Sequence, residues 1–222
     1  MNYPSPPWTL QGEAIQAVHL IDFAVARALV PAELDIITIF PGKTLGGIYL
    51  AHYQAGSVLE YHELIAIAAM VAGGGKIGAW ISHIYVDNIS SLLGGREIWG
   101  LPKELAQFTW YPGNPCPSVT VEKGERSLCS LACTNSILPV TTWGKLPFNG
   151  SVFSTLDTNL VFFESEFSAR FKVVSGKLDI PKTSPLNDLN LGQPLLTVYC
   201  EEMRLVVPVP EIVQQAVEFS YS

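Results

Sequence analysis

Hydrophobic positions recur with a period of two residues over much of the chain, a pattern typical of β-strands that bury one face. Runs of this kind, many of them rich in β-branched and aromatic residues, lie at 12–21, 35–40, 44–53, 63–71, 77–86, 104–110, 117–122, 126–133, 169–174 and 194–207. The sequence Gly-Gly-Gly-Lys at 73–76 separates two of these runs and predicts a hairpin turn. It lacks the spacing of a phosphate-binding loop.

Helical patterns are few and short. We expect helices at 23–30, 89–95 and 211–219. Asp22 and Asn88 can cap the first two, and Pro210 precedes the third. The first helix is expected to stop at Pro31, and the second at its own two glycines. The stretch 181–193, rich in Pro and Asn, predicts a surface loop.

Many strands and few helices in a chain of 222 residues predict one domain, residues 1–222, of the mainly β (α+β) class. The pattern favours an antiparallel barrel or sandwich with a few short peripheral helices. Small-molecule sites in barrels lie in the interior or at the mouth. A polar side chain that points into such an interior is therefore a candidate for function.

Composition narrows the classes of partner. Hydrophobic residues make up 48% of the chain and charged residues 15%, so a core or a large oligomer interface must bury much apolar surface. The net charge is −7 without a block of Lys or Arg, which disfavours nucleic acid and anionic membranes as partners. The N-terminus lacks a signal-peptide pattern, and the longest apolar run, 64–72, is too short for a bilayer. We expect a cytoplasmic protein.

The four cysteines are Cys116, Cys129, Cys133 and Cys200, and they contain no Cys-x-x-Cys pair. Strand alternation places Cys129 and Cys133 on one face, which is weak support for zinc. We expect buried thiols in a reducing compartment and no metal site. His62 and His83 are expected to be hydrogen-bonded polar residues, because no metal-ligand spacing surrounds them.

Lys103 follows Pro102 within the segment GGREIWGLPKELAQF, residues 94–108, where most neighbours are apolar. The run G-R-E-x-x-G-x-P-K-x-L at Gly95–Leu105 resembles the Schiff-base lysine segment of the acetoacetate decarboxylase family. Three shorter pieces are similar to segments of that family and occur in the same order, PSPPW at 4–8, LEYHE at 59–63 and HIYVDN at 83–88. The resemblance covers roughly the first half of the chain.

The resemblance implies a closed antiparallel β-barrel with helices at its rim, a lysine inside the barrel, and assembly into homo-oligomers. It also implies chemistry without a bound cofactor. In that family the lysine amine attacks a ketone and forms an iminium. The iminium draws electrons from the bond to a carboxylate, carbon dioxide leaves, and water then releases the ketone.

The match places the nucleophile at Lys103, which could otherwise be an ordinary buried lysine, and an active-site acid at Glu63. Glu63 is either the acid/base or the partner that keeps Lys103 charged. Tyr85 is expected to line the pocket and could donate a proton from its hydroxyl. Arg96 is a candidate clamp for a substrate carboxylate, or it forms an internal ion pair with an acid such as Glu97.

Departures from the family pattern fall beside the lysine and in the N-terminal segment. Glu104 stands where the family has a second lysine, and residues 8–14 lack the family's arginine. The position of a third carboxylate of the family site falls near Ile48 or Tyr49, so that carboxylate is missing as well. For a lysine to be neutral at pH 7, its pKa must be lowered by roughly 3 units, which corresponds to about 4 kcal/mol. Glu104 would oppose that shift if it lay close, but adjacent strand residues point to opposite faces. Burial beside Leu101 and its apolar neighbours would then be the only cause that lowers the pKa of Lys103.

These observations predict a lyase that forms a lysine Schiff base with a small β-keto acid or a related carbonyl compound. The reaction would be decarboxylation, or retro-aldol cleavage or dehydration, and the departures favour a substrate other than acetoacetate. The alternative is a non-catalytic β-barrel that binds a small apolar carbonyl ligand. Either function requires a small-molecule carbonyl partner and neither requires a metal.

Overall fold

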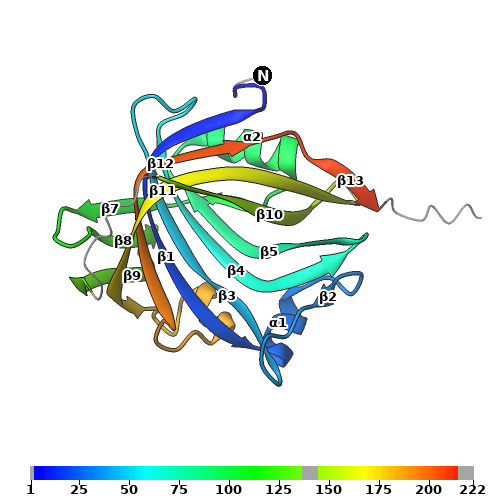
Figure 1. The fold of residues 1–222 in the computed structure, drawn as a ribbon, viewed down its shortest axis with the longest axis horizontal. Coiled ribbons are helices and arrows are strands. Elements are labelled where there is room, and N and C mark those ends of the chain that lie inside the picture. The colour runs from blue at the N-terminus through cyan, green and yellow to red at the C-terminus, as the bar shows by residue number, and fades with distance from the viewer. Residues whose placement is uncertain (1–2, 137–144, 215–222) are drawn as a thin grey trace, which may run out of the picture.

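The computed structural model describes residues 3–136 and 145–214 of the chain (Figure 1). Its strands are β1 (Trp8–Asp22), β2 (Asp35–Ile36), β3 (Lys43–Tyr53), β4 (Tyr61–Gly73), β5 (Lys76–Val86), β6 (Lys103–Leu105), β7 (Gln107–Tyr111), β8 (Ser118–Lys123), β9 (Arg126–Ser136), β10 (Leu146–Leu156), β11 (Asn159–Asp179), β12 (Leu196–Val207) and β13 (Glu211–Gln214). The helices are α1 (Phe23–Leu29) and α2 (Ile89–Trp99), with a 3-10 turn, η1 (Pro185–Leu189). Neither α-helix of this described part is long and apolar enough to cross a membrane.

Seven strands close into a barrel in the order β10-β5-β4-β3-β1-β12-β11, and β11 returns to pair with β10. All of these pairs are antiparallel except β10 with β5, which is parallel at Val152↔Ala79 and Phe153↔Trp80. A ring with an odd number of strands requires one parallel pair, because strand direction cannot alternate all the way around. The mainly β class and the closed antiparallel barrel expected from the sequence are confirmed.

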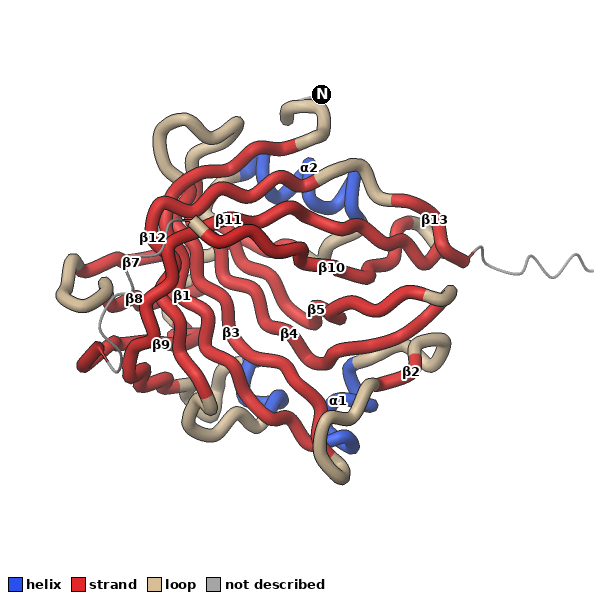
Figure 2. Tube along the Cα trace, in the orientation of Figure 1, coloured by secondary structure: helices blue, strands red, loops and turns tan. Residues whose placement is uncertain are grey.

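Strand β11 is long enough to belong both to the barrel and to an outer layer of strands. It pairs with β10 and β12 in the barrel and then continues outward to pair with β9, which extends the sheet through β8 to β7 (Figure 2). Outward-facing Ile15 and Leu64 join a buried cluster that includes Val121 and Leu131 of the outer strands. A separate cluster fills part of the barrel interior. The barrel strands therefore carry apolar residues on both faces, because the interior buries one face and the outer layer covers the other.

Two of the helices expected from the sequence differ from the structure. Residues 211–214 form β13, which pairs with β11 at Val161↔Ile212, and the rest of the expected helix lies outside the described residues. The edge of β11 offers unpaired backbone groups there, and strand pairing satisfies them. Helix α2 continues through both glycines to Trp99 and ends at Gly100, which has φ 62° as its C-cap.

The cysteines also differ from expectation. Cys116 and Cys133 form a disulfide, with Cα atoms 5.9 Å apart, whereas Cys129 and Cys200 are free and buried. The register of β8 with β9 brings the segment before β8 alongside Cys133, so the pairing depends on tertiary structure that spacing alone did not reveal. The expectation of four thiols is therefore wrong for this pair.

The disulfide predicts a labelling pattern. When the protein is unfolded in guanidinium chloride without a reductant, iodoacetamide should modify Cys129 and Cys200 only. After reduction, all four cysteines should react. Mass spectrometry of tryptic peptides measures both states. Full labelling before reduction would contradict the pairing.

Candidate active site

Lys103 begins β6, a short strand that pairs in parallel with β5 at Ile84↔Lys103 and Tyr85↔Glu104. Ile84 faces the barrel interior, so the register turns Lys103 inward and its neighbour Glu104 outward. The lysine is only 3% exposed. The expectation that Lys103 lies inside the barrel is confirmed, while its chemical role stays a prediction.

Helix α2 holds the lysine from one side. The Asn88 side chain accepts hydrogen bonds from the backbone N–H groups of Ser90 and Ser91 and so fixes the start of the helix. Ser91 is fully buried, and its Oγ lies 3.0 Å from Lys103 Nζ, which donates to it. A Cβ on Gly95 would come within 2.4 Å of Lys103 Cδ. The helix therefore needs glycine where the lysine stem crosses it.

Glu63 of β4 faces Lys103 across the interior. Lys103 Nζ lies 2.7 Å from Glu63 Oε1, and Tyr53 donates a hydrogen bond of 2.9 Å to the other carboxylate oxygen. The ammonium also lies 5.2 Å from the ring centre of Tyr61 and 5.9 Å from that of Trp8. The two charges are buried together, each with polar partners, as buried ions require.

The tyrosines around this ion pair remain protonated. Burial raises the pKa of Tyr53 and of Tyr61 well above the ordinary value, and the negative charge of Glu63 is the next largest cause. Tyr53 therefore acts as a hydrogen-bond donor to Glu63 at any physiological pH. Neither hydroxyl is available as a base near neutrality.

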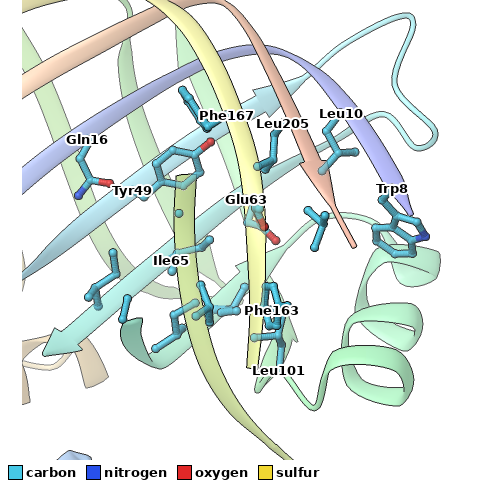
Figure 3. A pocket seen from close by; sticks show the side chains of 18 of the residues that line it. Trp8, Leu10, Gln16, Tyr49, Glu63, Ile65, Leu101, Phe163, Phe167 and Leu205 are labelled. Carbon is cyan, nitrogen blue, oxygen red and sulfur yellow. The ribbon is translucent and has the colours of Figure 1, made fainter. Parts of the chain in front are cut away.

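A cavity of about 430 Å³ occupies the barrel interior, and Lys103 and Glu63 both line it. Figure 3 shows Glu63 among the side chains of the lining. Most of the cavity wall is aliphatic or aromatic, supplied by inward-facing side chains of β1, β3, β4, β5, β10, β11 and β12. Among the described residues that line it, Lys103 and Glu63 are the only charged ones. Trp8 packs edge to face on Trp99, with ring centres 4.8 Å apart, and closes the wall beside the lysine.

Of the six site residues expected from the sequence, three share the cavity, namely Lys103, Glu63 and Leu101. Glu63 and Lys103 are also directly paired, as expected of a buried carboxylate. Leu101 follows the end of α2 and contributes to the apolar wall next to the lysine.

The other three lie elsewhere, and their expected contacts with a substrate are corrected. Glu104 is about two-fifths exposed and pairs with Lys123 on the outer layer. Tyr85 points into the outer cluster, where burial raises its pKa to about 12. Arg96 donates from Nε to the backbone oxygen of Lys103 at 2.8 Å, so it holds the lysine segment in place instead of facing a ligand.

Three contacts of the site were not anticipated from the sequence. Tyr61 lies two residues before Glu63 on β4, so strand alternation alone could have placed it on the same face. Tyr53 reaches the site because β3 pairs with β4 at Tyr53↔Tyr61, which depends on hairpin register. Ser91 carries no sequence signal, since its position depends on how α2 packs against β6.

None of the four histidines, all of which belong to the described part of the chain, lines this cavity. His62 Nδ1 is 2.6 Å from Asp87, and His83 Nδ1 is 3.0 Å from Ser82 Oγ. The described residues contain no group of three or more His, Cys, Asp or Glu side chains arranged to hold a metal ion. The arrangement around Lys103 supplies an amine, a carboxylate and tyrosine hydroxyls in an apolar enclosure, which suits carbonyl chemistry.

Comparison with known proteins identifies relatives. The sequence model described as acetoacetate decarboxylase matches residues 1–138. The tomato (Solanum lycopersicum) protein NEOXANTHIN-DEFICIENT 1 is 35% identical over 109 residues, which are 49% of this chain and 37% of that protein. An acetoacetate decarboxylase from Ralstonia nicotianae is 30% identical over 105 residues, or 47% and 40% of the two chains. The matches thus span less than half the length of these relatives.

Solved structures resemble the fold over nearly the whole chain. The crystal structure of acetoacetate decarboxylase from Legionella pneumophila has a TM-score of 0.75 at 15% identity, covering 96% of this chain and 89% of that one. The enduracididine biosynthesis enzyme MppR complexed with pyruvate has a TM-score of 0.70 at 16% identity, covering 96% and 92%. At such identities the likeness concerns the fold alone.

The close approach of α2 to the lysine generates a stability prediction. The Gly95→Ala variant should lose about 1–3 kcal/mol of the free energy of unfolding, because the added Cβ forces the Lys103 stem and its ion pair to move. This loss should appear although alanine is the better helix former. Urea denaturation measures it. Gly192→Ala is the control, since a Cβ there meets nothing within 4 Å. Equal stability of both variants would contradict the account.

Proposed function

The chain belongs to the acetoacetate decarboxylase family, and on that premise we propose that Lys103 forms a Schiff base with a carbonyl compound as the first step of a lyase reaction. The observation that supports this most strongly is the buried Lys103–Glu63 pair in the wall of an apolar cavity. Burial in an apolar pocket is one way to activate a lysine amine as a nucleophile toward carbonyl groups, and a carboxylate within hydrogen-bonding reach can exchange protons with it.

The proposed reaction begins with a proton transfer. Glu63 takes a proton from the Lys103 ammonium, which leaves a neutral amine next to a neutral carboxyl group. The amine adds to the carbonyl carbon, and Glu63 returns the proton to the resulting hydroxyl, which departs as water. The product is a cationic Schiff base on Lys103 and a carboxylate on Glu63, so the charge balance of the cavity is restored.

The Schiff base then acts as an electron sink for a bond one carbon away. In a retro-aldol cleavage, Glu63 accepts the proton of the β-hydroxyl while the carbon–carbon bond breaks to give an enamine and an aldehyde. Protonation of the enamine and hydrolysis by water release the second product and free Lys103. In a decarboxylation the same bond breaks with loss of carbon dioxide instead.

Charge favours substrates other than acetoacetate. In the described lining, Lys103 is the only cation, and Glu63 already pairs with it. A substrate carboxylate would therefore enter an apolar barrel without a partner, which is costly. We propose that retro-aldol or dehydration chemistry on a carbonyl compound fits this cavity better than decarboxylation of a small keto acid.

Binding without turnover is the second candidate. Glu63 Oε1 lies 2.7 Å from Lys103 Nζ and forms an ion pair with it, and the described lining of the cavity contains no second cation. A permanently charged lysine could hydrogen-bond a ligand carbonyl without attacking it. The two candidates differ in whether a covalent adduct forms.

Assembly and location also remain proposals. A homo-oligomer is supported by exposed apolar side chains, among them Ile77 at 60% and Ile212 at 56%. The cytoplasmic location expected from the sequence is opposed by the Cys116–Cys133 disulfide, because such bonds are rare in reducing compartments.

Reductive trapping tests the Schiff base. Incubation with aldehydes or ketones and sodium borohydride should leave a stable adduct on Lys103, located by peptide mass spectrometry. The Lys103→Ala variant should form none. Lys123→Ala is the matched control, because that lysine is 47% exposed on the outer layer, and it should label at Lys103 as the unmodified protein does. A protein that binds carbonyl compounds without forming any adduct would support the binder instead.

The role of Glu63 in proton transfer predicts the same sign for two measurements. In Glu63→Gln the group that takes the proton from Lys103 and returns it to the departing hydroxyl is lost, so borohydride trapping at pH 7 should slow by roughly tenfold or more. Product formation should slow by about 100-fold, because the later proton transfers are lost as well. Glu104→Gln is the control and should change neither rate, since that carboxylate faces outward. Unchanged turnover in Glu63→Gln would remove Glu63 from the mechanism.

A further inference from the structure

We propose that the cavity takes a long, uncharged, apolar carbonyl compound, with its carbonyl group at Lys103 and its tail along the barrel toward Phe148. The placement of the carbonyl rests on the proposed function, whereas the length and neutrality of the ligand rest on the cavity alone. Three features support the ligand class, namely the extent of the cavity, the state of its polar groups and the position of its opening.

The extent of the cavity exceeds what a small keto acid fills. Tyr61 and Ile67, six residues apart on β4, both line it, which corresponds to roughly 20 Å along the strand. At the usual tilt of barrel strands this is roughly 15 Å along the barrel axis. The volume of about 430 Å³ is in the range of sites for drug-sized ligands. A ligand of a few carbons would leave most of this apolar surface uncovered.

Two of the polar side chains along the cavity bond to the wall itself. Gln16 Nε2 lies 3.4 Å from the backbone oxygens of Ala17 and Ile48. The Tyr49 hydroxyl lies 3.1 Å from Met203 Sδ. Away from Lys103 the walls are mostly aliphatic and aromatic, so a charged or sugar-like ligand would lose its hydration without replacement. The far part of the cavity therefore suits a hydrocarbon tail.

The opening lies away from the lysine. Among the described residues that line the cavity, Phe148 is the only exposed one, at 46%, whereas Lys103 is 3% and Trp8 2% exposed. Phe148 packs against Phe167 and Phe171, with ring centres 4.5 Å and 5.7 Å apart, and forms an aromatic rim. In Figure 3, Trp8 and Gln16 mark opposite ends of the lining. A ligand that enters past Phe148 would reach Lys103 with its carbonyl end leading and its tail behind.

Gly150 allows the outer part of the cavity to be filled selectively. It lines the cavity on β10 between inward-facing Phe148 and Val152, and a Cβ there meets nothing within 4 Å. A leucine at this position would occupy open space near the rim without strain in the backbone. Its outward-facing neighbour Asn149, which bonds Glu164, offers the matched control Asn149→Leu.

The test compares a four-carbon and a ten-carbon methyl ketone by isothermal titration calorimetry. The unmodified protein should bind the long ketone at least about 100-fold more tightly, since each buried methylene contributes about 0.8 kcal/mol. Gly150→Leu should weaken the long ketone by at least about tenfold and leave the short one within about twofold. Asn149→Leu should change neither. Equal affinities for both lengths, or equal losses for both in Gly150→Leu, would overturn the proposed length.

A ten-carbon carboxylate tests neutrality in the same assay and should bind at least about tenfold more weakly than the ketone, given the cost of an unpaired buried charge. Tighter binding of the carboxylate would overturn it.

Borohydride trapping separates this inference from the proposed function. Length-dependent binding without an adduct supports the ligand class and refutes the Schiff base. An adduct with short keto acids, and no binding of long ketones, refutes the ligand class and leaves the Schiff base standing.

Discussion

The buried ion pair between Lys103 and Glu63 is the constraint around which the barrel interior is arranged. Two charges in an apolar enclosure cost several kcal/mol each unless their geometry and remaining hydrogen bonds are satisfied. Ser91 from the helix and Tyr53 from the neighbouring strand supply those bonds. The glycine that lets the lysine stem cross α2 is a consequence of the same requirement. Removing one charge would leave the other buried without a counter-ion.

The same pair determines what the cavity can accept. Its charges cancel, so under the proposed mechanism a neutral carbonyl compound would form a cationic Schiff base that keeps Glu63 as its counter-ion. A ligand with its own carboxylate adds one uncompensated negative charge in the described lining. The arginine and second lysine expected from the family resemblance are absent from the corresponding positions of this chain. The electrostatics of this site therefore differ from those that the family pattern implies.

Glu104 is adjacent to Lys103 in sequence but has no direct electrostatic contact with it. Lys103 and Glu104 are adjacent on β6, and the parallel pairing with β5 sends one side chain inward and the other outward. Glu104 then pairs with Lys123 of the outer layer. That layer, formed by β7, β8 and β9, also covers the outer face of the barrel. The carboxylate next to the amine in sequence thus stabilises the contact between layers instead of the charge on the amine.

The sequence by itself determined the class of fold and the identity of the central pair. Period-two patterns are local, so they revealed most of the strands, although not β10, and the family resemblance pointed to Lys103 and Glu63. Tertiary structure decided what depends on register and packing. The roles of Ser91 and Tyr53, the outward turn of Tyr85 and the use of Arg96 as a backbone support all follow from which strands and helices meet. The disulfide and the strand at 211–214 likewise required partners distant in sequence, whose backbone and side-chain groups no local pattern encodes.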